Sequence, residues 1–281
     1  MSLNFPFHDV SIREVTLTRK VTNPSFADNY WQMNQNEFAM HVEEIGSFYA
    51  CNGNEIEFAL DRGVSAESAQ LYLNGSVYGA ILHQRQILPM HGSCFSYNDA
   101  GVMLCGESGT GKSALTAAFS FNRCKFLTDD VSPIVFREGI PHILALSDRI
   151  KLWDDTLEQL NLDKTGLKRI SPETEKYYFK IDRSNSDPVS LKFIFMLEIH
   201  GQKETIISEL GGSERFSSLQ GEIYRREYLN GMPDNEKIYF RNIVDISNNV
   251  NIYCVKRPGS VSISDLMIQL RDHMIKNANI E

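Results

Sequence analysis

The stretch that most constrains this chain is a glycine-rich segment, "GESGTGKS", which runs from Gly106 to Ser113. It satisfies the pattern Gly-x4-Gly-Lys-Ser/Thr in full. An apolar run precedes it and a helical pattern, "KSALTAAFSF", follows it. Glycines allow backbone angles that turn successive N–H groups inward, and a helix start adds positive partial charge. The segment therefore predicts a phosphate site between a buried strand and a helix.

The predicted phosphate-binding residues are those of the segment and the one after it. They are Gly106, Glu107, Ser108, Gly109, Thr110, Gly111, Lys112, Ser113 and Ala114. In such a loop the lysine, here Lys112, reaches the β- and γ-phosphates, and the hydroxyl of Ser113 ligates Mg²⁺. The expected cofactors are therefore ATP and Mg²⁺, although the segment alone does not separate a kinase from an ATPase or a GTPase.

An acidic pair follows this segment after a single helix. "KFLTDD" reads as a buried strand that ends in Asp129 and Asp130. An isolated Asp-Asp is more often a cap or a turn, but this pair lies at a strand end directly behind a phosphate segment. Two carboxylates there can divide the work of phosphoryl transfer, one on the metal and one accepting a proton from an attacking hydroxyl. The pair favours transfer to a hydroxyl over simple nucleotide binding.

Composition excludes several classes of protein. The 281-residue chain has a formal net charge of −8, which disfavours sequence-independent binding of nucleic acid. The five cysteines include no Cys-x-x-Cys pair, so we expect free thiols in a reducing compartment. The sequence shows no secretory signal and no apolar run near the ~20 residues needed to cross a bilayer. We expect a cytoplasmic protein that binds neither membrane nor nucleic acid.

The pattern along the chain predicts two domains. Residues 1–62 read as a small β-rich domain, with strands at Ser47–Cys51 and Glu55–Leu60 joined by a hairpin through Asn52-Gly53. Residues 63–281 read as an α/β catalytic domain that begins with a helix capped by Ser65 and continuing to Gln84. A hairpin at Asn98-Asp99 would lead into the glycine-rich segment, which favours a mixed sheet.

Further elements are predicted downstream of the acid pair. Strands are expected at His142–Leu146, Val189–His200 and Lys237–Ser247, and helices at Asp154–Asn161 and Val261–Lys276. The best candidate for a flexible loop is "DRSNSDP", residues 182–188.

The segment from Met90 to Asp130 resembles the core of the HPr kinase/phosphorylase family. A His-Gly pair precedes the phosphate segment, and one helix later the chain reaches an Asp-Asp strand end, as in that family. The flanking pieces Leu82–His91, Lys151–Trp153 and Glu175–Tyr177 look like a divergent branch that includes lasso-peptide-associated serine kinases. The resemblance implies a P-loop core of the HPr-kinase/PEP-carboxykinase type with a mixed sheet.

The resemblance also implies an activity and roles for residues. It implies ATP-dependent phosphorylation of a serine hydroxyl on a peptide or small protein, and members often form homo-oligomers. Carried over to this chain, Asp129 is the general base, and Asp130 holds Mg²⁺ with Ser113. His91 lies beside the phosphate. Lys151 and Lys176, which lie next to aromatic residues in the matching segments, are the extra cations that phosphoryl transfer requires.

Two alternatives remain at this point. A small-molecule kinase could use the same core, and so could a regulatory nucleotide-binding protein that hydrolyses slowly or not at all. The sequence also leaves open whether the donor is ATP, GTP or pyrophosphate.

Overall fold

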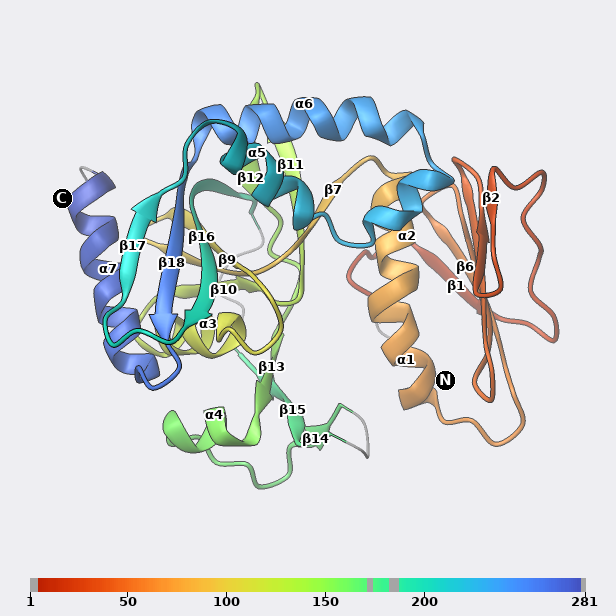
Figure 1. The fold of residues 1–281 in the computed structure, drawn as a ribbon. Coiled ribbons are helices and arrows are strands. Elements are labelled where there is room, and N and C mark those ends of the chain that lie inside the picture. The colour runs from red at the N-terminus through yellow and green to blue at the C-terminus, as the bar shows by residue number, and fades with distance from the viewer. Residues whose placement is uncertain (1–4, 171–173, 182–186, 279–281) are drawn as a thin grey trace. The chain divides into compact units, whose positions relative to one another are not determined.

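The computed structural model describes residues 5–170, 174–181 and 187–278. It is a mixed α/β fold, and the internal contacts divide the chain into two compact units (Figure 1). Unit 1 comprises Met1–Pro89 and Ile223–Asn242, and unit 2 comprises Met90–Glu222 and Ile243–Glu281. Two of the boundaries fall inside elements, namely strand β7 (Leu88–His91) and helix α6 (Asp234–Asn249).

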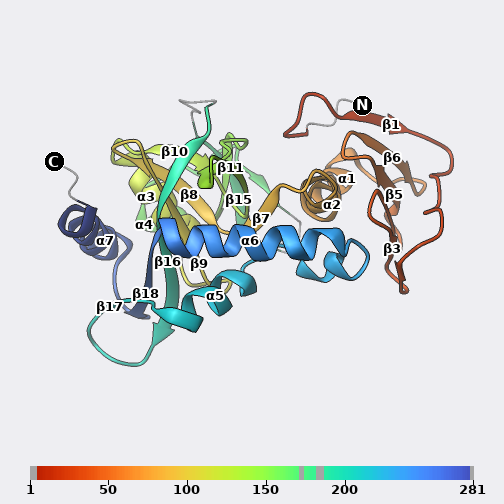
Figure 2. The same cartoon turned by 90° about the horizontal axis from the view of Figure 1, so that it is seen from above.

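Unit 1 is an open sheet covered by a helix. The sheet has the order β1-β6-β5-β4-β3-β2, in which β1 is parallel to β6 and the other neighbours are antiparallel. Its strands are β1 (Ser11–Glu14), β2 (Phe26–Ala27), β3 (Trp31–Met33), β4 (Glu37–Val42), β5 (Gly46–Cys51) and β6 (Glu55–Leu60). The helix is α1 (Ala66–Tyr72), which continues through the π-turn η1 (Leu73–Val77) into α2 (Tyr78–Gln84). Figure 2 looks down this helix and shows the sheet along one side of it.

The local signals in this unit are confirmed. Asn52 and Gly53 both adopt positive φ between β5 and β6, as the predicted hairpin requires. The side chain of Ser65 accepts a hydrogen bond from the Ser68 N–H at 3.2 Å and caps the helix.

The division into units differs from the predicted boundary after residue 62. The sheet of β1–β6 has one apolar face, and the helix over residues 66–84 buries that face with Ala69, Leu73, Val77, Ala80 and Ile81. The segment Ile223–Asn242 joins the same core through Tyr228 and Met232, and it includes the short 3₁₀ helix η2 (Arg226–Asn230). A sheet that leaves its apolar face uncovered is not stable, so these segments belong to unit 1.

Unit 2 carries the glycine-rich segment on a larger mixed sheet. That sheet has the order β10-β8-β9-β16-β12-β11-β7, with β18 pairing β16 and β17 pairing β18. Its further strands are β8 (Ser93–Tyr97), β9 (Ala100–Cys105), β10 (Lys125–Thr128), β11 (Val131–Arg137), β12 (Ile140–Ile143), β16 (Val189–His200), β17 (Ile206–Glu209) and β18 (Asn251–Pro258). A separate sheet has the order β13-β15-β14 and consists of β13 (Arg149–Trp153), β14 (Lys168–Arg169) and β15 (Lys176–Lys180).

The helices of unit 2 are α3 (Lys112–Phe121), α4 (Asp154–Gln159), α5 (Gly212–Gly221) and α7 (Ile263–Ala278), together with the C-terminal part of α6. Both views place α7 beside β17 and β18 (Figures 1 and 2). Helices α3 and α7 share a core with β9, β16 and β18, in which Phe119 of α3 stacks on Phe95 of β8 at 4.2 Å between ring centroids. This packing holds α3 against the sheet.

The long central strand β16 positions the glycine-rich segment. Its residues pair in parallel with β9 on one side and with β18 on the other. The predicted hairpin before the segment is present, because β8 and β9 are antiparallel and Asn98 and Asp99 both have positive φ. The chain therefore enters the segment from a strand that is hydrogen-bonded on both edges.

The predicted strand over Lys237–Ser247 is wrong, because these residues lie in helix α6. The stretch mixes aromatic and aliphatic residues in a way that suggests a strand. Its buried side chains, however, are Tyr239, Ile243 and Ile246, while Phe240 is 60% exposed. Those intervals of four and three residues are the period of a helix.

Other predicted elements are confirmed with small shifts at their ends, including the helices now seen as α4 and α7. The predicted flexible loop at 182–188 lies outside the described residues except for Asp187 and Pro188. Across the part of the chain that is described, none of the helices combines the length and the apolar character needed to cross a membrane.

Replacing Phe119 by alanine tests the packing that holds α3. Phe119 is 2% exposed and stacks on Phe95, so Phe119→Ala should lower the free energy of unfolding by about 3–5 kcal/mol. Phe121 lies on the same helix but is 43% exposed, so Phe121→Ala should cost less than about 1 kcal/mol. Chemical denaturation measures both values, and equal losses would contradict the packing described.

Candidate functional site

The glycine-rich loop, Gly106–Ser113, contains glycines with positive φ angles. Gly106 has φ +125°, and a Cβ there would overlap the backbone carbonyl of Leu197 in β16. Gly111 has φ +99° and is the residue from which α3 begins. Both positions need glycine, since other residues adopt such angles only with strain. The loop therefore turns tightly from β9 into the first turn of α3.

The ammonium group of Lys112 lies over its own loop. Its Nζ donates hydrogen bonds to the carbonyl oxygens of Gly106 at 2.5 Å and Glu107 at 3.1 Å. Among the described residues Lys112 forms no ion pair, and these carbonyl dipoles are its hydrogen-bond partners. Ser108–Ala114 line the pocket above the loop. Gly106 and Glu107, which were also predicted to bind phosphate, supply these carbonyls.

The acid pair lies against the start of α3. Asp129 accepts a hydrogen bond from the Ser113 hydroxyl at 2.8 Å on one carboxylate oxygen, and from the backbone N–H of Lys151 at 2.9 Å on the other. Burial raises the pKa of Asp129, and these two hydrogen bonds only partly offset that effect. The hydrogen bond to Ser113 brings the strand-end carboxylate to the glycine-rich loop.

The second aspartate has a different environment. Asp130 accepts a hydrogen bond from Lys151 Nζ at 2.6 Å, and its side chain is 33% exposed in the pocket. Burial alone would raise the pKa of Asp130, but the Lys151 ammonium outweighs it, and the pKa is held below the usual range. The two neighbouring carboxylates therefore differ in pKa: the pKa of Asp129 is raised, and that of Asp130 is lowered. This differs from the predicted roles, because Ser113 contacts Asp129 and not Asp130.

His91 joins this cluster from the end of β7. Its Nδ1 lies 3.8 Å from a carboxylate oxygen of Asp130, and its backbone N–H donates to the Glu222 carbonyl at 2.6 Å. Burial lowers the pKa of His91, and the charge of Lys112 lowers it further. Asp130 and Asp129 oppose this shift, but the net lowering of the pKa favours the neutral imidazole beside the acid pair.

The two predicted cations come from the small sheet β13-β15-β14. Lys151 lies on β13, where its pair with Asp130 raises its pKa although burial opposes this. Lys176 on β15 faces Trp153 of β13, with Nζ 5.3 Å from the ring centroid, and burial lowers its pKa. The structure thus brings together His91, Lys112, the acid pair and both lysines around one pocket.

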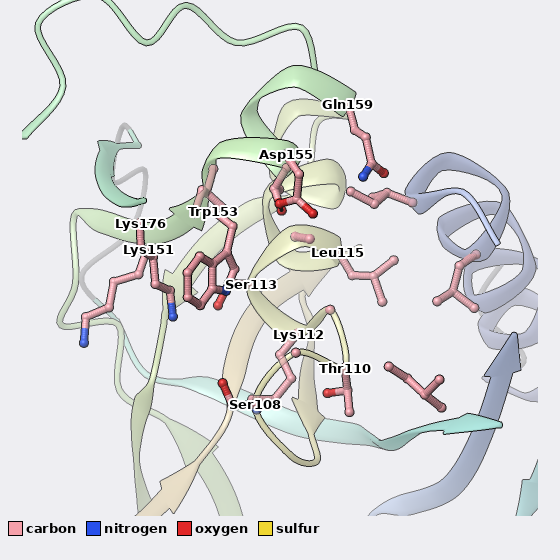
Figure 3. A pocket seen from close by; sticks show the side chains of 18 of the residues that line it. Ser108, Thr110, Lys112, Ser113, Leu115, Lys151, Trp153, Asp155, Gln159 and Lys176 are labelled. Carbon is pink, nitrogen blue, oxygen red and sulfur yellow. Dashed lines mark hydrogen bonds between the residues drawn. The ribbon is translucent and has the colours of Figure 1, made fainter. Parts of the chain in front are cut away.

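That pocket has a volume of about 840 Å³ and two chemically different sides. Lys151, Lys176 and Trp153 lie on one side of the loop, while Leu115 faces away from them toward the segment after β18 (Figure 3). The volume falls within the ~300–1,000 Å³ of small-molecule sites. The pocket has room for a nucleotide together with a reacting group.

Among the pocket residues that sequence reasoning missed is Arg257, near the end of β18. Its Nε donates to the Thr110 carbonyl of the loop at 2.8 Å. The two residues lie far apart in the sequence, and "VKRPG" around Arg257 matches no motif. Only the pairing of β18 with β16 brings this arginine to the loop.

The side chains present fit a magnesium ion. The hydroxyl of Ser113 and the carboxylate of Asp129 are hard oxygen donors in direct contact, which is the ligand type that Mg²⁺ prefers. Within the described ranges no three His, Cys, Asp or Glu side chains gather to hold a metal by themselves. A site of this kind would be completed by phosphate oxygens and water, as is common for magnesium-nucleotide complexes.

Comparison with known proteins gives little beyond this geometry. No model of a protein family matches the sequence, and no curated protein matches it. Among solved structures, the HPr(Ser) kinase/phosphatase from Coxiella burnetii is similar, with 11% sequence identity over 67% of this chain and 97% of that chain. The TM-score is 0.36, which carries no weight for activity. The function must be argued from the residues of the pocket.

Replacing Lys151 by methionine tests the electrostatics of the acid pair. Methionine keeps the backbone N–H that binds Asp129 but removes the ammonium that lowers the pKa of Asp130. In wild-type protein, Asp129 should titrate above the usual aspartate range and Asp130 below it. In Lys151→Met the pKa of Asp130 should rise. Carboxyl ¹³C NMR measures both groups.

Lys164→Met provides the control for this titration. Lys164 forms an exposed pair with Asp154 at 2.9 Å and is not among the charges that shift either member of the acid pair. This change should leave both titrations where they are. An unmoved Asp130 in Lys151→Met would show that the 2.6 Å contact does not control its pKa.

Proposed function

We propose that this chain is a Mg²⁺-ATP-dependent kinase that transfers the γ-phosphoryl group to a serine hydroxyl on a peptide or small protein. The observation that carries the proposal is the 2.8 Å hydrogen bond from Ser113 to Asp129, which joins an acidic strand end to a complete phosphate-loop motif. A serine on a peptide or small protein is proposed as the acceptor from the resemblance of Met90–Asp130 to the HPr kinase/phosphorylase family.

We divide the roles of the acid pair by their contacts. Both oxygens of Asp129 are occupied, one by the Ser113 hydroxyl and one by a backbone N–H. Asp129 and Ser113 would therefore hold the magnesium ion, whose charge neutralises the phosphate oxygens. Asp130 is 33% exposed to the pocket and is the carboxylate that an acceptor hydroxyl can reach. This reverses the roles implied by the resemblance.

The reacting groups then have the following tasks. The acceptor oxygen forms a bond to the γ-phosphorus as the bond from that phosphorus to the β-bridging oxygen breaks, and ADP leaves with that electron pair. The acceptor proton passes to Asp130. The lowered pKa of Asp130 makes it a weak base. A weak base suffices, because the transition state of phosphoryl transfer is loose and little of the acceptor proton has to be removed.

The cations of the pocket stabilise the phosphoryl group as it moves. Lys112 would exchange its contacts with the loop carbonyls for the β- and γ-phosphates. Lys151 is bound to Asp130 and lies beside the path of the transferred group, while Lys176 has its pKa lowered by burial. Ammonium groups in a site with little water are worth several kcal/mol to developing phosphate charge.

Paired aspartate variants test the proposed roles. Asp130→Asn should lower the rate of phosphate transfer from γ-labelled ATP by about 100-fold or more, while the affinity for Mg²⁺-ATP changes little. Asp129→Asn should weaken Mg²⁺-dependent binding of ATP, since it loses the carboxylate beside Ser113. The acceptors are peptides encoded near its gene, together with a serine peptide library, and calorimetry measures the affinity.

Asp99→Asn is the matched control, because Asp99 lies in the β8–β9 hairpin and pairs with exposed Lys125. It should leave transfer and binding unchanged. Full turnover by Asp130→Asn would show that Asp130 is not the base. Loss of turnover with intact ATP binding in Asp129→Asn would return the role of base to Asp129, as the resemblance first implied. Tight ATP binding with no labelled peptide would favour a small-molecule acceptor or a regulatory protein.

A further inference from the structure

The two sides of the pocket determine how a bound phosphate donor is oriented. Lys151 and Lys176 lie with Trp153 on one side of the loop, and both aspartates line the same pocket (Figure 3). The γ-phosphate must face that side, because the transferred group has to meet the carboxylates and their lysines. The remainder of the donor must therefore leave the loop on the opposite side.

That opposite side is apolar. It is lined by Leu115 of α3, Ile199 of β16, and Val261, Ile263 and Leu266 around the start of α7. In Figure 3 aliphatic side chains from the α7 end of the chain face Leu115 across the pocket. Ile199 is 52% exposed although it lies in a strand, so it offers apolar surface to the pocket and not to the core. Contact with such a surface does not stabilise a charged phosphate chain, whereas a flat nucleobase is stabilised by burying its faces there.

Arg257 stands between the loop and this apolar side. Its Nε donates to the Thr110 carbonyl at 2.8 Å, and its Nη1 donates to the Pro258 carbonyl at 3.1 Å. A Cβ at Gly111 would lie 3.5 Å from its Nη2, so the guanidinium lies directly against the loop. In the part of the chain that is described, Arg257 has no ion pair. Its N–H groups and planar face suit the end of a nucleotide that carries the base.

The wall at the start of α7 is already held in place. The hydroxyl of Ser262 donates to the Asp265 carboxylate at 2.7 Å and accepts from the Asp265 N–H at 3.0 Å. The Ser262 side chain is thus engaged by this cap, while Gln159 of α4 also lines the pocket and lies on the α7 side in Figure 3. Recognition here would come mainly from shape and apolar contact, with Arg257 and Gln159 as the polar groups nearest the base.

We propose that the apolar side formed by Leu115, Ile199, Val261, Ile263 and Leu266, together with Arg257, is the nucleobase site of the phosphoryl donor. This inference rests on the proposed function and deepens it, because it selects a nucleoside triphosphate over inorganic polyphosphate or pyrophosphate. The base packs against the aliphatic wall, and the phosphates run along the loop toward Asp130.

The test compares ATP with tripolyphosphate, which has the same phosphate chain without a nucleoside. Calorimetry in Mg²⁺ should show that wild-type protein binds ATP at least about tenfold more tightly. Ile199→Asn should weaken ATP binding about tenfold and leave tripolyphosphate binding unchanged. The exposure of Ile199 makes the change compatible with folding, which circular dichroism checks.

Ile206→Asn is the matched control. Ile206 is 43% exposed on β17, which pairs with β18, and does not line the pocket, so its replacement should alter the binding of neither ligand. Equal binding of ATP and tripolyphosphate by wild-type protein would overturn the base site but leave the proposed kinase intact, as would an Ile199→Asn variant that binds ATP normally. Absence of binding by either ligand would overturn both the inference and the proposed function.

Discussion

The hydrogen bond between Ser113 and Asp129 is the interaction on which the rest of the site depends. It joins the first turn of α3 to the end of β10, and the second oxygen of Asp129 ties in β13 through the Lys151 N–H. A half-buried carboxylate is costly unless its oxygens are hydrogen-bonded, so the three segments converge on it. Once they converge, Lys151 Nζ meets Asp130, and the small sheet closes one side of the pocket.

Electrostatics inside the pocket contrast with the acidic character of the whole chain. The net charge of −8 would repel a polyanion at long range, yet Lys112, Lys151 and Lys176 gather around the acid pair. The lowered pKa of His91 favours its neutral form, so Lys151 is the main positive charge beside Asp130. Under the proposed function, a bound phosphate would share these lysines with the carboxylates and bring its own counterion.

The part of the site whose residues lie close together in the sequence could be predicted. The part that strand pairing brings together from distant segments could not. The loop, α3 and the acidic strand end lie within 25 consecutive residues, so their spacing alone places them together. Lys151 and Lys176 were identified only through a resemblance, since an isolated lysine has no periodic signal. Arg257 was missed because the register of β18 on β16 brings it to the loop. The stretch that forms α6 was predicted as a strand, because its aromatic residues obscure the helical spacing of its buried side chains.

Strand β16 sets both ends of the pocket at once. The Leu197 carbonyl lies where any Cβ at Gly106 would have to go, and two residues later Ile199 pairs with Arg257 and reaches the apolar side. One strand therefore positions both the glycine-rich loop and the proposed base site. A single-residue insertion between these two positions would displace the two ends relative to each other, so this short interval should be the part of the fold least tolerant of changes in length.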